Sequence, residues 1–176
     1  MSWEFIDWGQ VDDEPAGASE VRDPEAGNMV LRIVDVDSDE ANMRLWLVVD
    51  VAEGPQAGFY ATDFYADKPY AHRLMVSMKN LGFAKRKLQA VSDSNPGFDA
   101  LAAIRNPRLY VGKVVGAGVG LEERENRTTG KRYMCHDFFH ANLGTAADAR
   151  AGRLKVPEDI RMDGGAADAG SEDVPF

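Results

Sequence analysis

Apolar and polar residues alternate along two early segments of the chain, which predicts two β-strands. Residues 29–37 are rich in β-branched side chains. Residues 43–51 then place one apolar set on a single face, made of Met43, Leu45, Leu47, Val49 and Val51. This set is the natural core face, so Arg44 and Trp46 are expected to point outward together.

A third strand and then a helical region are expected after these two. Residues 58–65 form the third strand in this interpretation. Lys68-Pro69 is typical of a helix start, and the apolar positions at Leu74, Met78 and Leu81 follow a helical spacing that ends at Gly82. A short second helix is expected over residues 98–104, before Asn106-Pro107.

Two further strands, at residues 109–123 and 131–140, are joined by a polar hairpin loop at residues 124–130. Glycines at 112, 116, 118 and 120 suit a strand that coils sharply to close a small barrel. The predicted order of elements is therefore three strands, a helical region and two more strands. An OB-fold has this order. The predicted fold class is therefore mainly β: a five-stranded OB-fold barrel with a helical region between strands three and four, and a disordered acidic C-terminal tail.

Composition divides the chain into three parts. Residues 1–27 read as an acidic N-terminal segment rich in Gly, Ala and Pro, and residues 28–140 as the OB-fold domain. Residues 141–176 shift to Ala, Gly and Asp and read as a flexible linker with an acidic tail. Within that part, residues 143–154 are the one stretch with weak helical character.

The formal net charge of −9 hides a partition along the sequence. Residues 1–67 hold 3 basic and 16 acidic side chains, whereas residues 68–161 hold 17 basic and 9 acidic ones. A basic middle between acidic ends can bind a polyanion locally. The net charge alone therefore does not exclude a nucleic-acid partner.

Several classes of protein are disfavoured. The chain has no apolar run of membrane-spanning length and no signal-peptide pattern, and its one cysteine, Cys135, fits a reducing cytoplasm. The glycines at 116, 118 and 120 lack the spacing of a dinucleotide fingerprint, and no phosphate-binding loop or zinc-protease motif is present. Neighbours among Cys135, His136 and Asp137 would point to opposite strand faces, so we expect no metal, no cofactor and no enzymatic activity.

The last residues of the sequence resemble a known recruitment peptide. Glu172, Asp173, Val174, Pro175 and Phe176 follow a Gly/Ala-rich leader, so an acidic pair precedes an aromatic anchor. A Phe ring can fill an apolar pocket while the acidic pair contacts a basic rim. This ending is similar to that of bacterial single-stranded DNA-binding proteins, which end in Asp-x-Pro-Phe.

The body of the chain resembles phage-encoded single-stranded DNA-binding proteins. The similarity covers roughly residues 1–140 and includes the Trp-containing acidic N-terminus, the barrel-like strand order, and the stretches Phe98–Ile104 and Tyr110–Lys113. It implies binding to single-stranded DNA in a bacterial host cytoplasm, in replication, recombination or repair. It also implies recruitment of the proteins of those processes through the tail.

The candidate nucleic-acid-binding residues combine aromatic rings with basic side chains. In OB-folds the groove crosses strands two and three and is bordered by the loops between strands one and two and between strands four and five. Aromatic faces next to guanidinium groups bind unstacked bases without reading sequence. About half of the aromatic residues must instead fill the core. The predicted set is Arg44, Trp46, Tyr60, Lys85, Arg86, Lys87, Arg124, Arg127, Lys131 and Arg132.

The sequence therefore predicts a noncatalytic protein that binds single-stranded DNA without sequence preference and recruits partners through residues 172–176. The alternative is an OB-fold protein-interaction module whose tail mimics the host peptide and competes for its partners. The outward aromatic and basic residues favour the first hypothesis, and the acidic first third of the chain favours the second. An enzyme acting on a small ligand is a third class, which lacks an identifiable polar site. The sequence does not indicate an oligomeric state.

Overall fold

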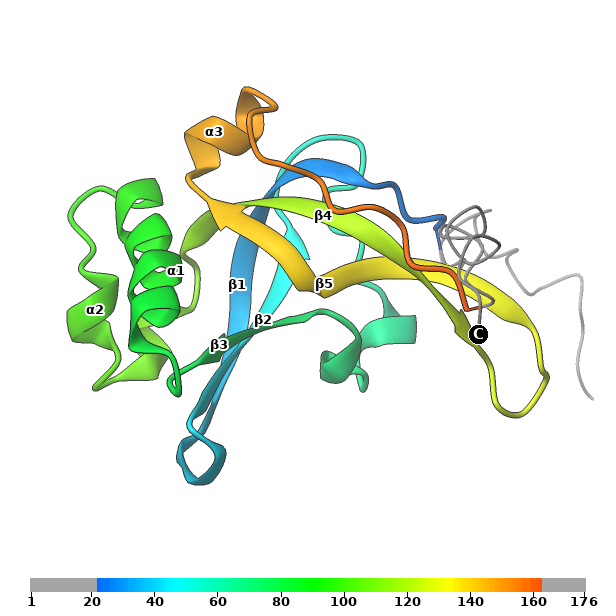
Figure 1. The fold of residues 1–176 in the computed structure, drawn as a ribbon, viewed down its shortest axis with the longest axis horizontal. Coiled ribbons are helices and arrows are strands. Elements are labelled where there is room, and N and C mark those ends of the chain that lie inside the picture. The colour runs from blue at the N-terminus through cyan, green and yellow to red at the C-terminus, as the bar shows by residue number, and fades with distance from the viewer. Residues whose placement is uncertain (1–21, 163–176) are drawn as a thin grey trace, which may run out of the picture.

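The computed structural model describes residues 22–162, and its strands form one antiparallel sheet (Figure 1). The sheet has the order β3-β2-β1-β4-β5, and β3 also approaches β5, so the sheet curls into a nearly closed barrel. Helices α1 (Leu81–Ser94) and α2 (Ala100–Ala103) lie between β3 and β4 in the chain. The predicted fold class is confirmed. The strands are β1 (Gly27–Asp39), β2 (Arg44–Val51), β3 (Arg73–Ser77), β4 (Val114–Glu125) and β5 (Arg132–Gly144).

Strands β1 and β2 form the predicted hairpin, with a short 3-10 helix, η2 (Glu40–Asn42), at its tip. The alternating residues Leu45, Leu47, Val49 and Val51 are all buried. The prediction that Met43 joins them is wrong, because Met43 has a left-handed backbone with φ of 53° and its side chain is 48% exposed. Met43 ends the 3-10 turn instead of entering the strand.

The third strand does not lie at residues 58–65. That region is part of a long connection, residues 52–72, with the 3-10 helices η3 (Asp63–Tyr65) and η4 (Pro69–Ala71). The buried carboxylate of Asp50 accepts hydrogen bonds from the backbone N–H of Val51 and of Tyr60, which turns the chain back on itself. The true third strand, β3, alternates buried Leu74 and Val76 with partly exposed neighbours.

The main helix also begins later than the spacing of Leu74, Met78 and Leu81 predicts. Asn80 caps α1, its side chain accepting a hydrogen bond from the N–H of Phe83 at 3.3 Å. Gly82 therefore lies in the first turn of the helix and does not end it. Within residues 22–162, none of the helices has the length and apolar character needed to cross a membrane.

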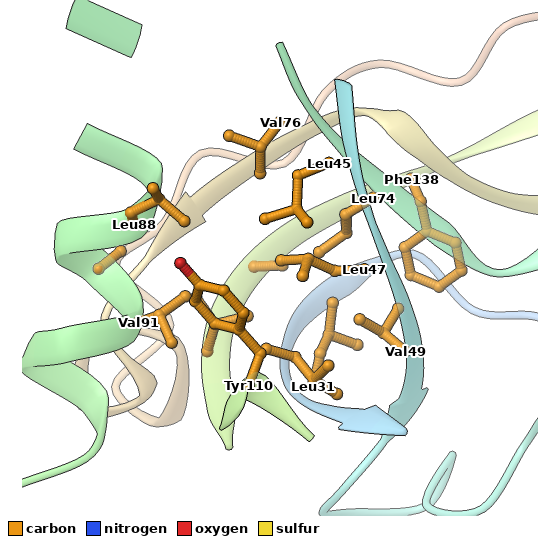
Figure 2. Close-up of a cluster of buried hydrophobic side chains, with 14 of the residues drawn as sticks. Leu31, Leu45, Leu47, Val49, Leu74, Val76, Leu88, Val91, Tyr110 and Phe138 are labelled. Atoms are coloured by element: carbon orange, nitrogen blue, oxygen red, sulfur yellow. The ribbon is translucent and has the colours of Figure 1, made fainter. Parts of the chain in front are cut away.

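The core fills the barrel and extends under α1, as Figure 2 shows. Side chains from β1, β2, β3 and β5 meet inside the barrel, and Leu88 and Val91 of α1 close one end. Tyr110 is fully buried there, and its hydroxyl donates to the carbonyl of Ala100 in α2. This desolvation raises the pKa of Tyr110 to about 12, so it remains a neutral phenol.

The folded domain continues past the predicted boundary at residue 140. Strand β5 runs to Gly144, α3 (Ala146–Arg150) follows, and residues 151–162 lie as a strap along β4 (Figure 1). Leu154 exchanges two backbone hydrogen bonds of 2.9 Å with the side chain of Asn28, and Ile160 bridges to β4 in parallel. Of the weak helix predicted at residues 143–154, only the part that forms α3 is helical. The predicted tail beyond the strap, residues 163–176, lies outside the described residues.

The β4 glycines have a different role from the predicted coiling. A Cβ atom at Gly116 would overlap the carbonyl of Thr145, and one at Gly118 would overlap that of Lys155. At Gly120 it would lie 2.6 Å from the carbonyl oxygen of Pro157. Alternate glycines therefore form a channel on one face of β4, into which the strap backbone fits.

Candidate nucleic-acid interface

The outward face of β1, β2 and β3 carries Trp46 at its centre. The strand register places Trp46 between Asp37 of β1 and Met75 of β3. The Arg73 guanidinium carbon lies 3.9 Å from the centroid of the Trp46 ring system. Trp46 is partly buried by this stack, so the structure presents a cation–aromatic pair on the face away from the core.

Arg44 is exposed at the start of β2, next to the same face. Its cross-strand neighbours are Asp39 of β1 and Ser77 of β3. The β1 side of the face is therefore acidic, because Asp35, Asp37 and Asp39 follow one another along it. The Arg108 guanidinium binds Asp35 at 2.5 Å, and this hydrogen bond lowers the pKa of the Asp35 carboxyl.

Tyr60 does not belong to an exposed site. The prediction placed it outward on the third strand, but its side chain is only 6% exposed. Its ring stacks on His72 with centroids 4.5 Å apart, and its hydroxyl is 2.6 Å from Nδ1 of His136. Burial raises the pKa of Tyr60. A base could stack on Tyr60 only if the ring left the core.

The connection between β2 and β3 presents other aromatic residues that the sequence-based prediction did not include. Phe64 is 45% exposed, and Nζ of Lys68 lies 4.4 Å from its ring centroid. Tyr65 packs edge-on against Phe64 at 4.9 Å, and burial raises its pKa, with a further contribution from nearby Tyr133 of β5. Tyr70 is 59% exposed on η4. These residues form the aromatic segment, residues 62–70.

The β4–β5 hairpin carries the basic residues that the sequence indicated. Arg124 lies across the ladder from Tyr133, and its guanidinium contacts Glu122 at 3.0 Å. Asn126 orders the loop by accepting hydrogen bonds from the N–H groups of Thr128 and Thr129. The other predicted hairpin residues, Arg127, Lys131 and Arg132, are exposed. In the view of Figure 1, β3 and the aromatic segment lie between this hairpin and the β1–β2 hairpin.

Lys85, Arg86 and Lys87 lie within α1, whereas the helix end predicted at Gly82 had placed them after a helix. Lys85 and Arg86 are exposed and line a shallow groove with Thr145 and Asp148. Lys87 turns instead toward β3, where its Nζ donates to the carbonyl of Met75 at 3.1 Å. Burial lowers the pKa of Lys87. The structure therefore brings Lys87 to the β3 edge and directs the other two away from it.

The possible metal ligands of β5 have other partners. His136 points into the barrel, whereas Cys135 donates to the carbonyl of Glu122, and burial raises the pKa of its thiol to about 11. Asp137 binds Nδ1 of His140 at 2.8 Å. In residues 22–162, no three His, Cys, Asp or Glu side chains are arranged to hold a metal ion.

No family model matches this chain, and no curated protein matches it. One signal in the sequence could have located the missed residues. Asn80 is a helix-capping residue, so the helix could have been started there, which would leave residues 73–77 free to be the third strand. The preceding Phe64–Tyr70 stretch would then become a surface connection.

Proposed function

We propose that this protein binds single-stranded DNA without sequence preference. The observation that carries the proposal is the pair of cation–aromatic contacts, Arg73 on Trp46 and Lys68 on Phe64, on and beside β3. Rings backed by a cation offer stacking surfaces to bases of any identity. The adjacent basic hairpin, with Arg124 and Arg127, supplies charge for phosphates.

The acidic row on β1 restricts the route that a nucleic acid can take. A phosphate backbone that crossed β1 would meet Asp37 and Asp39, so repulsion favours a path along β3. The proposed path starts at the β4–β5 hairpin, passes the aromatic segment and reaches Trp46. Lys85 and Arg86 lie off this path and are not expected to contact the bound strand.

The test is a titration of fluorescent oligothymidine with the full chain at two salt concentrations. Oligouridine and a duplex of the same length serve as comparison ligands. We expect the single-stranded DNA to bind more tightly than the duplex, because a duplex hides its base faces from Trp46 and Phe64. Equal affinity for both forms, or no binding at low salt, would contradict the proposal.

We further propose that Glu172–Phe176 recruit replication, recombination or repair proteins. Support comes from the sequence of this peptide, since these residues lie outside the described part of the chain. The strap also brings residue 162 beside the basic hairpin, where the N–H of Met162 donates to Glu123 at 3.3 Å. A partner held by the tail would therefore be near bound DNA.

The second candidate function, a protein-interaction module, is favoured by one observation. Asp37 and Asp39 share the outward face with Arg44 and Trp46, and such a mixed acidic, basic and aromatic face suits a protein surface. In this case the titration would show no preference for single strands. Binding would instead require a polypeptide with basic residues opposite β1.

A further inference from the structure

Residues 22–26 lie against the turn that leads into the β2–β3 connection. The guanidinium of Arg22 donates to the carbonyl oxygens of residues 55, 56 and 57 at 3.3, 3.4 and 3.0 Å. The side chain of Gln56 then joins the two segments. Its Oε1 accepts from the N–H of Glu25 at 3.0 Å, and its Nε2 donates to the carbonyl of Asp23 at 3.2 Å.

The two backbone partners of Gln56 set the orientation of its amide group. That orientation in turn determines which ring nitrogen of the buried His136 carries a hydrogen. A backbone N–H can only donate and a carbonyl can only accept, so the orientation of the Gln56 amide is assigned by the network. Its Oε1 faces Nε2 of His136 at 3.0 Å, and that nitrogen must therefore carry the hydrogen. Nδ1 of His136 is then the acceptor for the hydroxyl of Tyr60 at 2.6 Å.

Ring contacts of Tyr60 connect this hydrogen-bonded network to the protein surface. Its ring packs edge-on against Tyr65 with centroids 4.7 Å apart, and Tyr65 packs against exposed Phe64 at 4.9 Å. An uninterrupted series of contacts thus runs from the backbone of residues 23–25 to the proposed stacking surface. Both ring nitrogens of His136 are engaged, one by Gln56 and the other by Tyr60.

We propose that residues 22–26 are a latch that positions the aromatic segment through Gln56 and His136. This inference rests on the proposed function, because it concerns how the DNA-binding surface is held. Gln56 and His136 are positioning residues, and neither reaches the surface that would contact a base. Binding couplings are reciprocal, so DNA stacked on Phe64 would strengthen the docking of residues 22–26. A protein that pulled the N-terminal segment away would conversely weaken DNA binding.

The experiment compares Gln56→Leu with the wild-type full chain by amide hydrogen exchange and by oligothymidine titration. Gln56→Leu removes the three hydrogen bonds made by the Gln56 side chain and leaves those of Arg22 in place. The matched control is Glu53→Ala, which breaks the 2.6 Å ion pair between Glu53 and Arg150 on the same connection without touching the network. Gln56→Glu keeps the oxygen that faces Glu25 and His136.

The latch predicts that Gln56→Leu raises exchange in residues 59–68 by about tenfold, while β1 and β4 remain protected. Gln56→Glu should recover most of that protection, and Glu53→Ala should leave it unchanged. Unchanged exchange in Gln56→Leu, or an equal rise in Glu53→Ala, overturns the proposal whether or not DNA binds.

The DNA titration separates the latch from the proposed function. If the latch positions the aromatic segment, Gln56→Leu weakens oligothymidine binding about threefold to tenfold. Adding Phe64→Ala to Gln56→Leu then lowers the affinity by a smaller factor than Phe64→Ala does in the wild-type background. Additive effects of the two changes overturn the coupling. If the wild type fails to bind oligothymidine, the proposed function fails, whereas the exchange result still decides the latch.

Discussion

At the residue scale, Trp46 combines partial burial with the stacking role that we propose for it. Its ring is covered on one side by Arg73, whose guanidinium is 3.9 Å away, so one ring face contacts the protein. This arrangement holds the indole in place before a ligand arrives, which lowers the entropy lost on binding. It also means that Trp46 packs against the barrel surface, so its removal affects stability as well as binding.

Trp46→Ala should weaken oligothymidine binding by about 1–3 kcal/mol, the usual contribution of one stacked base. Titration of fluorescent oligothymidine measures this for both proteins, and in a Trp3→Phe/Trp8→Phe background that keeps Trp46 as the only indole, quenching of its fluorescence reports stacking directly. Leu109→Ala, a change at a 52% exposed apolar residue of the 3-10 helix η5 (Pro107–Tyr110), is the control and should bind as the wild type does. Unaltered affinity in Trp46→Ala would remove this residue from the interface.

His136 makes stability depend on pH. Burial lowers its pKa from 6.5 to about 4, so between these values the unfolded chain binds a proton that the folded chain excludes. The contribution of His136 to the free energy of unfolding should therefore be fully present above pH 6.5. It should fall by roughly 1.4 kcal/mol per pH unit as the pH drops toward 4. Urea unfolding at pH 7.5, 5.5 and 4.5 measures this slope.

His136→Gln cannot titrate and should show a flatter profile over the same range. Burial also lowers the pKa of His72, which adds a smaller dependence of the same sign in both proteins. An NMR titration that found the His136 ring protonating near pH 6.5 would contradict the assignment of its hydrogen bonds.

At the element scale, the strap packs closely against β4 because the glycines of β4 leave room for the strap backbone. Gly116 and Gly118 admit the backbone of residues 145 and 155, and Asn28 and Asn142 hold the strap by side-chain hydrogen bonds. The strap therefore covers a strand face that would otherwise expose a row of glycines. Its contacts also explain why the domain does not end with the last strand.

Gly118→Ala should destabilise the fold by about 2 kcal/mol, because the new methyl group overlaps the carbonyl of Lys155 and must displace the strap. Gly82→Ala is the matched control, since its Cβ would meet only Asn80 Oδ1 at 3.5 Å in the first turn of α1. The control should be neutral or up to about 1 kcal/mol more stable. Urea unfolding of both variants tests the difference, and equal effects would show that the strap is loosely held.

At the scale of the whole molecule, charge is distributed unevenly over the barrel. Acidic residues follow β1, whereas the β4–β5 hairpin carries exposed Arg124, Arg127, Lys131 and Arg132. The aromatic segment adds one cation, Lys68, which is paired with Asp67 at 3.0 Å. Such a partition orients an approaching polyanion toward one side of the barrel even though the net charge is −9. The proposed binding should therefore depend on salt.

The logarithm of oligothymidine affinity should fall with the logarithm of salt concentration at a slope of about −3 to −4, as expected when about five phosphates are neutralised. Replacing Arg124, Arg127, Lys131 and Arg132 together by Ala should bring the slope close to about −1. A variant that replaces Arg153 and Lys155 of the strap is the control and should keep the original slope. An unchanged slope in the hairpin variant would place the phosphate contacts elsewhere.

Deleting residues 171–176 should abolish capture of purified replication or repair proteins from the host and should maintain or tighten DNA binding. The tighter binding is expected at low salt, because the acidic peptide is tethered to residue 162, which lies beside the basic hairpin, and so competes at high effective concentration. Phe176→Ala should reproduce the loss of capture with little effect on DNA, and Ser171→Ala should do neither. Capture that survives both the deletion and Phe176→Ala would show that the tail has no recruiting role.

The sequence by itself determined the barrel order, the β1–β2 hairpin and the charged β4–β5 hairpin. These features depend on neighbours in the chain: alternation in residues 43–51 places Leu45, Leu47 and Val49 inside and Trp46 outside whatever surrounds them. The sequence also placed the basic residues of the hairpin at the surface, where the structure has them, because charged loop residues remain in water.

Tertiary structure alone decided which aromatic residues are exposed and where the third strand lies. Tyr60 is buried because Asp50 binds its backbone and His136 binds its hydroxyl, and His136 lies 76 residues further along the chain. The alternation of five residues in β3 is too short to distinguish a strand from a helix turn. The β4 glycines likewise acquire their role only when residues 145–160 fold back over them, a contact that no local pattern encodes.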